Sequence, residues 1–504
     1  MRTKNNLRFP ALAVLLLLLT IAQSLSASDF DSIFDNRVKN RFAESLLHKS
    51  ALNQPYAYVP AEDGFVHRFP SFKEFGESFV EAFDIGSPRR ALFSYRHPDL
   101  VADFNIYAGY ESNIHEDDSY GFLYKGWEIN AIALKKLQLH TDWYSGRFYG
   151  DPDLARTHLL LNSWNTTEDR TITTDNMRGE FAYVAEKTKL AIGRNTFRVG
   201  NSLSGSIILN DSTNDYGYLL GEFKLGDFSF ALMHGSIMAD SVKALTGSHF
   251  YDDKAYPDKF ISLHQLNWQA GKNTELFLGE SVIYGDRGMD VNYLLPNAFW
   301  RATEHNLKDR DNMMLYGGFN QRLPLDMLLY FQIAVDEFSY GKIFSSWWGN
   351  KYALQGGLEL PTSFADFAVE LSAVRPYTYA HYMNHTMYSH DGKGLGYPKG
   401  SNIVDLTLQA NVPIKKYADW TCRLSLSRSG SDGSSWKDNY HDIFAGQIQT
   451  AEAHWFDGVV TDEITLQNSI YIPIMAHHRF LIGHEMKKND ELSHRAFAAW
   501  QFFY

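Results

Sequence analysis

The sequence has little cysteine, a deficit of basic residues, and no long apolar run after its first 27 residues. Cys422 is the only cysteine among 504 residues, which excludes an intrachain disulfide framework or a cysteine-rich zinc site. The 47 Lys and Arg residues face 59 Asp and Glu residues, for a net charge of −12, whereas a nucleic-acid binder needs a basic footprint. A polytopic helical membrane protein is excluded as well, because it needs apolar runs of about 18 residues or more.

The N-terminus has the layout of an export signal. Three basic residues precede an apolar run over 11–22 and a group of small residues that ends near Ser28. This pattern predicts a signal peptide at residues 1–27, cleaved near Ser26 or Ala27. A membrane anchor is the weaker alternative, since 12 residues are too few to cross a hydrocarbon core of about 30 Å. Loss of the three basic residues would lower the net charge from −12 to −15.

Residues 28–98 show helical periodicity. Ser71 and Glu74 have the spacing of a capping box, and a run of phenylalanines follows on one helical face. We expect a small N-terminal periplasmic helical segment of two amphipathic helices that pack against the rest of the chain.

From residue 100 the apolar period changes from helical to alternating. Eighteen segments of about ten residues have one apolar and one polar face, from 100–110 and 121–134 to 495–504. Their connections alternate between short turns and long loops, which is typical of bacterial outer-membrane barrels. The sequence therefore predicts an all-β membrane protein, with a closed antiparallel transmembrane β-barrel of about 18 strands over residues 99–504. A soluble sandwich does not use so many strands.

The last predicted strand, 495–504, supports the prediction of an outer-membrane barrel. Tyr504, Phe502 and Trp500 lie on one face of it, which resembles the C-terminal aromatic signature of outer-membrane proteins. In such a barrel the polar faces point inward, so the lumen is expected to be lined by Asp103, Asp142, Asp336, Glu359, Glu370, Asp405 and Arg423. Mixed charges of this kind fit either an aqueous channel or an ion-paired plug.

Three segments between the strands carry further motifs. They are 193–209, 295–301 and the stretch with Arg-Pro-Tyr-Thr-Tyr at 375–379 followed by Leu-Gly-Tyr-Pro-Lys-Gly-Ser-Asn at 395–402. At these residues the chain resembles the Wzi capsule-assembly family of outer-membrane proteins. The resemblance implies an eighteen-stranded barrel with a periplasmic helical bundle, a lectin-like role in retaining capsular polysaccharide at the cell surface, and no catalysis.

Sugar binding combines aromatic rings, which stack on the CH faces of sugars, with a few polar groups that bond the hydroxyls. The loops supply both. The candidate polysaccharide-binding residues are Trp300, Arg301, Trp347, Trp348, Arg375, Tyr377, Tyr379, His381 and Asn402. Aromatic residues near strand ends also form the girdles that anchor barrels at membrane interfaces, which is the other interpretation of these rings.

Two alternatives remain from the sequence. A porin-like channel for sugars or oligosaccharides would use the same barrel with an open lumen. An enzyme is disfavoured, because Ser204 lacks a nucleophile-elbow context, and His381, His385 and His390 lie in a loop without a fixed metal-binding face. We therefore expect no catalytic residue, metal or cofactor. The expected partners are a surface polysaccharide, outer-membrane lipid and the outer-membrane assembly machinery, with the protein located in the outer membrane.

Overall fold

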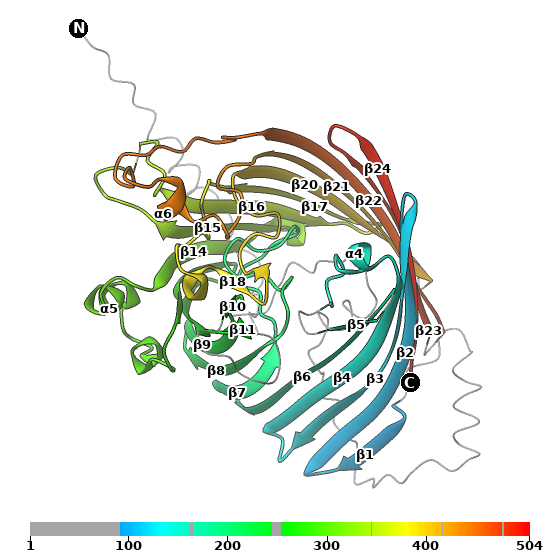
Figure 1. Cartoon of the computed structure of the whole chain (residues 1–504). Coiled ribbons are helices and arrows are strands. Elements are labelled where there is room, and N and C mark those ends of the chain that lie inside the picture. The colour runs from blue at the N-terminus through cyan, green and yellow to red at the C-terminus, as the bar shows by residue number, and fades with distance from the viewer. Residues whose placement is uncertain are drawn as a thin grey trace, which may run out of the picture.

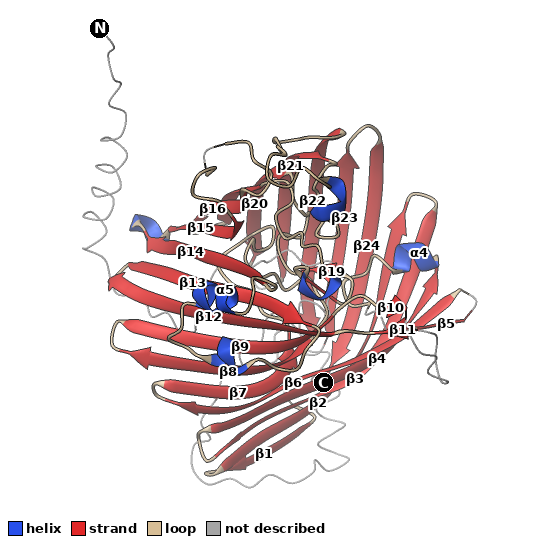
Figure 2. Ribbon diagram, turned by 60° about the vertical axis from the view of Figure 1, so that its left-hand side comes forward, coloured by secondary structure: helices blue, strands red, loops and turns tan. Residues whose placement is uncertain are grey.

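The chain forms a closed antiparallel barrel. The computed structural model describes residues 91–161, 165–168, 170–243, 254–343, 345–415, 417–475 and 478–504. Twenty strands of this part of the chain join in one sheet, which closes because β2 (Leu100–His115) pairs with β24 (Leu492–Phe503). Figures 1 and 2 show the strands running round the ring in chain order. Closure leaves no sheet edge exposed.

Eighteen of these strands make up the ring, which confirms the number predicted from the sequence. Between β2 and β24 they are β3 (Asp118–Ala133), β4 (Leu137–Gly150), β6 (Thr171–Ala185), β7 (Thr188–Asn195), β8 (Tyr216–Leu225), β9 (Phe228–Met238), β12 (Asp258–Gly271), β13 (Thr274–Gly285), β14 (Asn312–Arg322), β15 (Leu328–Glu337), β16 (Lys351–Pro361), β17 (Asp366–Val374), β20 (Ile403–Ile414), β21 (Ala418–Gly430), β22 (Val460–Met475) and β23 (His478–Lys488).

The remaining elements are short. β1 (Phe93–His97) and β5 (Thr166–Glu168) extend the sheet beside β2 and β6. Two small hairpins lie in loops: β10 (Val242–Lys243) with β11 (Lys254–Ala255), and β18 (Ser389–His390) with β19 (Lys393–Gly394). The helices are α4 (Pro152–Ala155), α5 (Trp300–Asn306), α6 (Tyr440–Ile443), η2 (Val291–Leu294), η3 (Pro324–Asp326) and η4 (Asn384–Thr386). Among the described residues, no helix has the length and apolar character needed to cross a bilayer.

The predicted signal peptide at 1–27 and most of the predicted helical segment at 28–98 lie outside the described residues. Of that segment the structure describes 91–98, where β1 runs antiparallel to the first residues of β2. The sheet thus begins a few residues before the predicted boundary at 99.

The two ends of the barrel differ in their connections. One end has short turns throughout, as predicted, and we call it the short-turn end. The other, the long-loop end, carries the loops 151–170, 196–215, 239–257, 286–311, 338–350, 375–402 and 431–459.

Two connections at the long-loop end are shorter than the sequence suggested. The prediction placed a loop over 111–120, but β2 and β3 continue to a tight turn at 116–117. Glu111 and Asn113 are buried, inward-facing residues of β2. The connection between β23 and β24 is likewise confined to 489–491.

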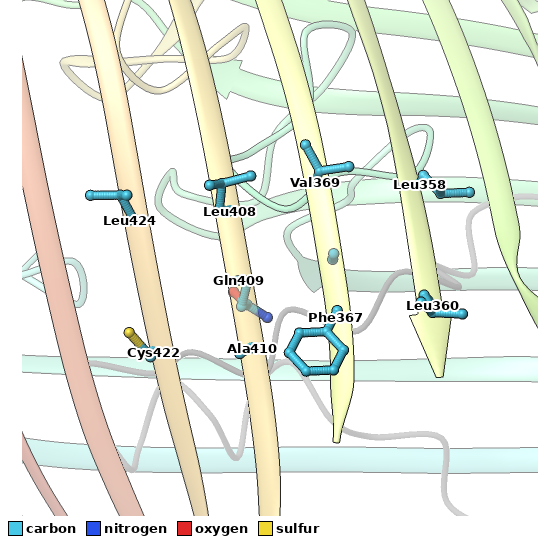
Figure 3. Close-up of a pocket in the computed structure, with 10 residues that line it drawn as sticks. Leu358, Leu360, Phe367, Val369, Leu408, Gln409, Ala410, Cys422 and Leu424 are labelled. Atoms are coloured by element: carbon cyan, nitrogen blue, oxygen red, sulfur yellow. The ribbon is translucent and has the colours of Figure 1, made fainter. Parts of the chain in front are cut away.

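The outer face of the ring is apolar, as the alternating pattern requires. Leu358, Phe367, Leu408 and Leu424 belong to four neighbouring strands and line a shallow apolar hollow on the outer wall (Figure 3). Thr407 and Gln409, the chain neighbours of Leu408, face the opposite way and are buried. Such an outer surface matches the apolar band of a membrane barrel.

Candidate functional site

Loop 196–215 folds into the barrel and crosses the lumen. It leaves β7 and returns to β8, yet its tip reaches the wall formed by β14 to β17. The carboxyl of Glu370 on β17 accepts hydrogen bonds from the backbone N–H groups of Leu203 (2.8 Å) and Ser204 (2.9 Å). Gln355 Nε2 on β16 donates to the carbonyl of Gly205 (2.9 Å), and Asn201 Nδ2 donates to Asn320 Oδ1 on β14 (2.6 Å).

Loop 375–402 packs on the loop that crosses the lumen. The hydroxyl groups of Tyr379 and Tyr388 donate to the carbonyls of Ile207 and Ile208, each at 2.7 Å. Ile207, Ile208 and Leu209 are fully buried in a cluster that includes side chains from both walls. In Figure 1 the β18 hairpin of this loop lies inside the ring of strands.

The acidic residues predicted to face the lumen therefore bind loops at three places. Glu370 holds loop 196–215. Asp336 Oδ2 accepts from the N–H of Tyr379 (3.0 Å), and Asp405 Oδ2 accepts from Tyr397 Oη (2.5 Å). Asp405 Oδ1 also pairs with Lys399 (3.0 Å). In this part of the barrel the wall carboxyls serve as anchors for inserted loops.

Three loops at the long-loop end bring aromatic rings together. Loops 338–350, 375–402 and 431–459 contribute Trp347, Trp348, Tyr377, Tyr382, Tyr440 and Phe444, which we call the aromatic loop cluster. The Trp348 ring centroid lies 4.4 Å from that of Tyr440 and 5.3 Å from that of Phe444. Rings at these separations attract one another beyond the area that they bury.

A buried cation supports the cluster from the barrel wall. Lys351 Nζ on β16 lies 4.2 Å from the ring centroid of Tyr440 and 5.2 Å from that of Trp348. It also pairs with Glu337 Oε2 on β15 (2.9 Å) and donates to the carbonyl of Ala380 (3.2 Å). The cation–π contacts fix the rings above the strand ends.

The rim of the cluster combines accessible rings with polar groups. Tyr382 is half-buried and stacks on the exposed His441, with ring centroids 4.4 Å apart. On the other side, Lys342 Nζ lies 4.5 Å from the ring centroid of Trp347. The rim thus leaves the exposed ring of His441 and part of Tyr382 accessible at one place, and carries a lysine cation over Trp347 at another.

Arg375 and Asn402 tie the loops to one another. Arg375 Nε and Nη2 donate to the carbonyls of Asn350 (3.1 Å) and Ala453 (2.9 Å). Burial lowers the pKa of Arg375 from its usual value. Asn402 Nδ2 donates to the carbonyls of Asp432 and Asp457, and its Oδ1 accepts from the N–H of Phe456 (2.7 Å). Both side chains join loops that are far apart in sequence.

His381 lies buried below Tyr382. Its Nδ1 shares a short hydrogen bond with Thr386, and its ring centroid is 4.4 Å from that of Tyr382. Burial, reinforced by the cation of Lys351, holds the pKa of His381 well below its usual value of 6.5. A neutral imidazole therefore supports the accessible ring of Tyr382.

The other histidines of this loop do not join His381. His390 Nδ1 accepts from the N–H of Met238 (2.9 Å) and so is tied to the wall at β9. Among the described residues, Glu304, His305 and Asp309 form the one group whose ligand atoms converge as for a metal ion. The guanidinium of Arg301 already contacts two of them, with a short bond to Glu304 and 3.3 Å to Asp309.

The structure distributes the nine candidate residues over three places. Trp347, Trp348, Tyr377, His381, Arg375 and Asn402 lie in or beside the aromatic loop cluster. Tyr379 lies in the lumen. Trp300 and Arg301 lie in loop 286–311, where Trp300 is fully buried. A sugar contact by any of them stays a prediction.

Sequence reasoning missed part of the cluster. Tyr440, His441 and Phe444 come from the short capped helix α6 and the residues around it, and Lys351 opens a strand. No spacing in the chain connects them to Trp348, because they meet only through the folding of separate loops. The excess of aromatic residues in the long loops was the available signal.

No family model matches the chain, and no curated protein matches it. Among solved structures the chain is similar to Wzi, an outer-membrane protein involved in group 1 capsule assembly in Escherichia coli and described as a carbohydrate-binding β-barrel. The two are 12% identical with a TM-score of 0.52, over 80% of this chain and 84% of that one. The resemblance seen in the motifs thus extends to the fold.

The chain is also similar to two Pseudomonas aeruginosa proteins, OccK5 (OpdH) and OpdQ. They are 10% and 9% identical to it, with TM-scores of 0.44 and 0.45, over 81% of this chain and 98% of each of theirs.

Proposed function

We propose that this chain lies in the outer membrane and binds a surface polysaccharide with its aromatic loop cluster, so that the polymer is retained at the cell surface as in capsule assembly. The observation that carries the proposal is the rim of that cluster. A half-buried ring, Tyr382, is held in place by His381 and His441, and the ammonium group of Lys342 lies beside Trp347. Stacking rings with a few fixed polar groups are what sugar sites need.

The likeness to Wzi supports the proposal at the level of the fold. The described part of the chain adds that the long loops are held rigidly by Arg375, Asn402 and Lys351. Rigid loops bind with a smaller loss of conformational entropy. Lys342 also offsets the net negative charge locally, which matters for an acidic polymer because screening is strong beyond about 8 Å.

Binding to the polysaccharide extracted from the surface of the producing cells tests the proposal. We expect Tyr382→Ala to weaken binding by the purified protein in detergent about tenfold, equivalent to about 1.4 kcal/mol, as measured by calorimetry. Tyr340→Ala is the matched control. Tyr340 is 88% exposed in the neighbouring loop, makes an edge-to-face ring contact with Phe338, and is not a member of the cluster. Equal affinities of both variants and the wild type would refute the site.

A porin-like channel is the second candidate, and the barrel itself supports it. The loop that crosses the lumen favours retention over transport, because Glu370 and Gln355 bind it to the far wall. Planar-bilayer recordings separate the two functions. We expect low conductance from the wild type and a large increase when residues 199–210 are replaced by a short Gly-Ser linker. Steady, high conductance by the wild type would favour the channel.

We propose no catalytic function. Ser204 Oγ bonds Glu370 and lies 3.1 Å from the hydroxyl of Tyr397. Neither neighbour supplies the general base with an orienting partner that an activated serine requires. Release of reducing sugar from the extracted polysaccharide by the purified protein would contradict this.

A further inference from the structure

The outer wall of the barrel carries a polar patch on β9, β12 and β13. His234, Ser262, His264 and Glu280 are buried although their positions on the strands face outward, as do the exposed residues Leu266 and Leu278. The strand register places His234 opposite Ser262 and His264 opposite Glu280. His264 Nε2 lies 2.9 Å from Glu280 Oε2, and His234 Nδ1 lies 2.8 Å from Ser262 Oγ. Facing lipid, such groups would be costly.

Loop 286–311 covers part of this patch from outside. The indole of Trp300 stacks on His264 with ring centroids 4.0 Å apart, and its backbone N–H donates to Glu280 Oε2 (2.8 Å). Tyr293 and Trp300 pack against the outward side chains of Val282, Tyr284 and Met313. In Figures 1 and 2 helix α5 lies outside the ring of strands, beside β12 and β13.

Polar contacts fix the base of the loop. Arg287 forms two bonds to Asp311, at 2.8 and 2.7 Å, so that the second and the last residue of the loop are joined. Tyr293 Oη donates to Asp311 (2.7 Å), and the N–H of Asp290 donates to Tyr284 Oη (3.0 Å). The loop is therefore attached to the wall at both ends and in the middle.

Over residues 289–299 the exposed side chains of the loop are mainly apolar, whereas the exposed residues of 302–310 include His305, Lys308, Asp309 and Arg310. Met289, Val291, Leu295 and Phe299 are exposed by 50, 66, 51 and 59%. Polar residues would be expected there if the loop extended into water. Trp300 contacts Glu280, which lies five residues before the end of β13. At a rise of about 3.4 Å per residue and a tilt of about 45°, this is about 12 Å below the strand end.

The exposed side chains also continue the apolar surface of the bare wall. Leu266 and Leu278, two residues along from His264 and Glu280, are exposed by 45 and 66%. The bare wall is thus apolar here, and loop 286–311 covers the polar pair His264 and Glu280 together with apolar side chains such as Val282 and Met313.

We propose that loop 286–311 is a lipid-facing flap, whose partner is the acyl-chain region of the outer leaflet, with Met289, Val291, Leu295 and Phe299 in contact with the chains. The flap shields the polar patch from lipid and replaces it by an apolar surface. The inference rests on the membrane location proposed above and is independent of polysaccharide binding, so that either can fail alone.

Fluorescence quenching tests the flap. In a Cys422→Ser background, Phe299→Cys, Val291→Cys and Tyr340→Cys variants carry a bimane label and are reconstituted into phosphatidylcholine vesicles with or without brominated acyl chains. We expect brominated chains to quench the labels at 299 and 291 at least threefold more than the label at 340. Aqueous iodide should quench in the reverse order. Two flap positions keep the test usable if one variant does not fold.

Two outcomes overturn the proposal. Labels at 299 and 291 that iodide quenches as strongly as the label at 340 would place the flap in water. Labels protected from both quenchers, together with cross-linked dimers or trimers in the vesicles, would show a second copy of the chain on this surface. In either case the binding of polysaccharide by the Tyr382 rim remains open to its own test.

Discussion

Loops 196–215 and 286–311 leave the same end of the barrel and fold in opposite directions. The first enters the lumen and the second lies on the outer wall. Each is held by a glutamate of a strand that accepts backbone N–H groups, Glu370 for the first loop and Glu280 for the second. Glu370 points inward and Glu280 points outward. Side chains alternate between the two faces of a strand, so an anchoring glutamate points either into the lumen or outward. Each of the two loops packs on the face to which its glutamate points.

The burial of side chains in each loop matches the place where the loop packs. Ile207, Ile208 and Leu209 of the inward loop are completely buried, since side chains surround them on both sides. The outward loop buries Trp300 against the wall and leaves Phe299 exposed, because only one of its sides meets protein. A loop inside a barrel packs like a core, whereas a loop on the wall is amphipathic.

Removing Glu370, the residue that holds loop 196–215 inside the lumen, should have the largest effect on stability. Glu370→Ala leaves the buried N–H groups of Leu203 and Ser204 and the hydroxyl of Tyr330 without their acceptor. We expect a loss of about 4 kcal/mol in the free energy of unfolding, measured by urea unfolding in detergent, together with raised conductance in planar bilayers.

The Glu370→Gln variant is the control for that change. It keeps one acceptor oxygen and the same shape, so we expect it to recover about half of the lost stability and most of the wild-type conductance. If Glu370→Ala unfolds at the wild-type urea concentration, the glutamate does not anchor the loop.

Replacing Trp300, whose ring packs loop 286–311 against the outer wall, should have a smaller and more local effect on stability. Trp300→Ala deletes the stack on His264 and leaves a cavity against Tyr293, for which we expect a cost of about 3 kcal/mol, confined to loop 286–311. Trypsin should then cut faster after the exposed Lys308 and Arg310, while the barrel core stays resistant.

Phe299→Ala, at the neighbouring exposed position, is the comparison for Trp300→Ala. The Phe299 ring makes no ring contact with another described residue, so its removal should leave the cleavage rate unchanged in detergent. Equal acceleration by both variants would mean that Trp300 does not hold the loop to the wall.

Acidification should have the smallest effect and should act through His381, beside the aromatic loop cluster. Because burial lowers the pKa of His381 well below 6.5, the unfolded chain binds a proton near pH 6.5 while the folded chain stays neutral. The stability is complete above pH 6.5 and falls as the pH drops below it, by up to about 1.4 kcal/mol per pH unit. Unfolding at pH 7.5 and 5.5 measures the slope.

His381→Gln should make this slope less steep, since glutamine does not titrate and can still bond Thr386. His390, whose pKa burial lowers to about 4, keeps its own contribution. His454→Gln, at an exposed position in loop 431–459, should leave the slope as in the wild type. A slope in His381→Gln as steep as that of the wild type would assign the pH dependence to other groups.

Much of the fold was predictable from the chain, because strand periodicity is a local property. The alternation over residues such as 403–412 and 419–428 identified both the strands and their apolar, outward-facing sides, and the structure confirms eighteen ring strands. The prediction ended the first strand at 110 and began the next at 121, whereas β2 and β3 continue to the turn at 116–117 with Glu111 and Asn113 facing a lumen that accepts polar side chains. A local pattern does not distinguish a polar lumen from solvent.

The candidate site was predictable only in part. Trp347, Trp348 and Tyr377 do share one cluster, as their place in long loops suggested. Trp300 fits the same sequence criterion but lies on the outer wall. Composition shows that a loop is aromatic, but the direction in which the loop folds depends on contacts with distant strands.

The sequence by itself determined the number of strands, the closed barrel that they imply and the face of each strand that is apolar, since all three follow from side-chain alternation between neighbouring residues. Only the tertiary structure decided that loop 196–215 fills the lumen, that loop 286–311 lies on the wall and that Tyr382 meets His441. These choices depend on hydrogen bonds and ring contacts between residues far apart in the chain, such as Ile208 and Tyr388, which are 180 positions apart, and no local pattern encodes them.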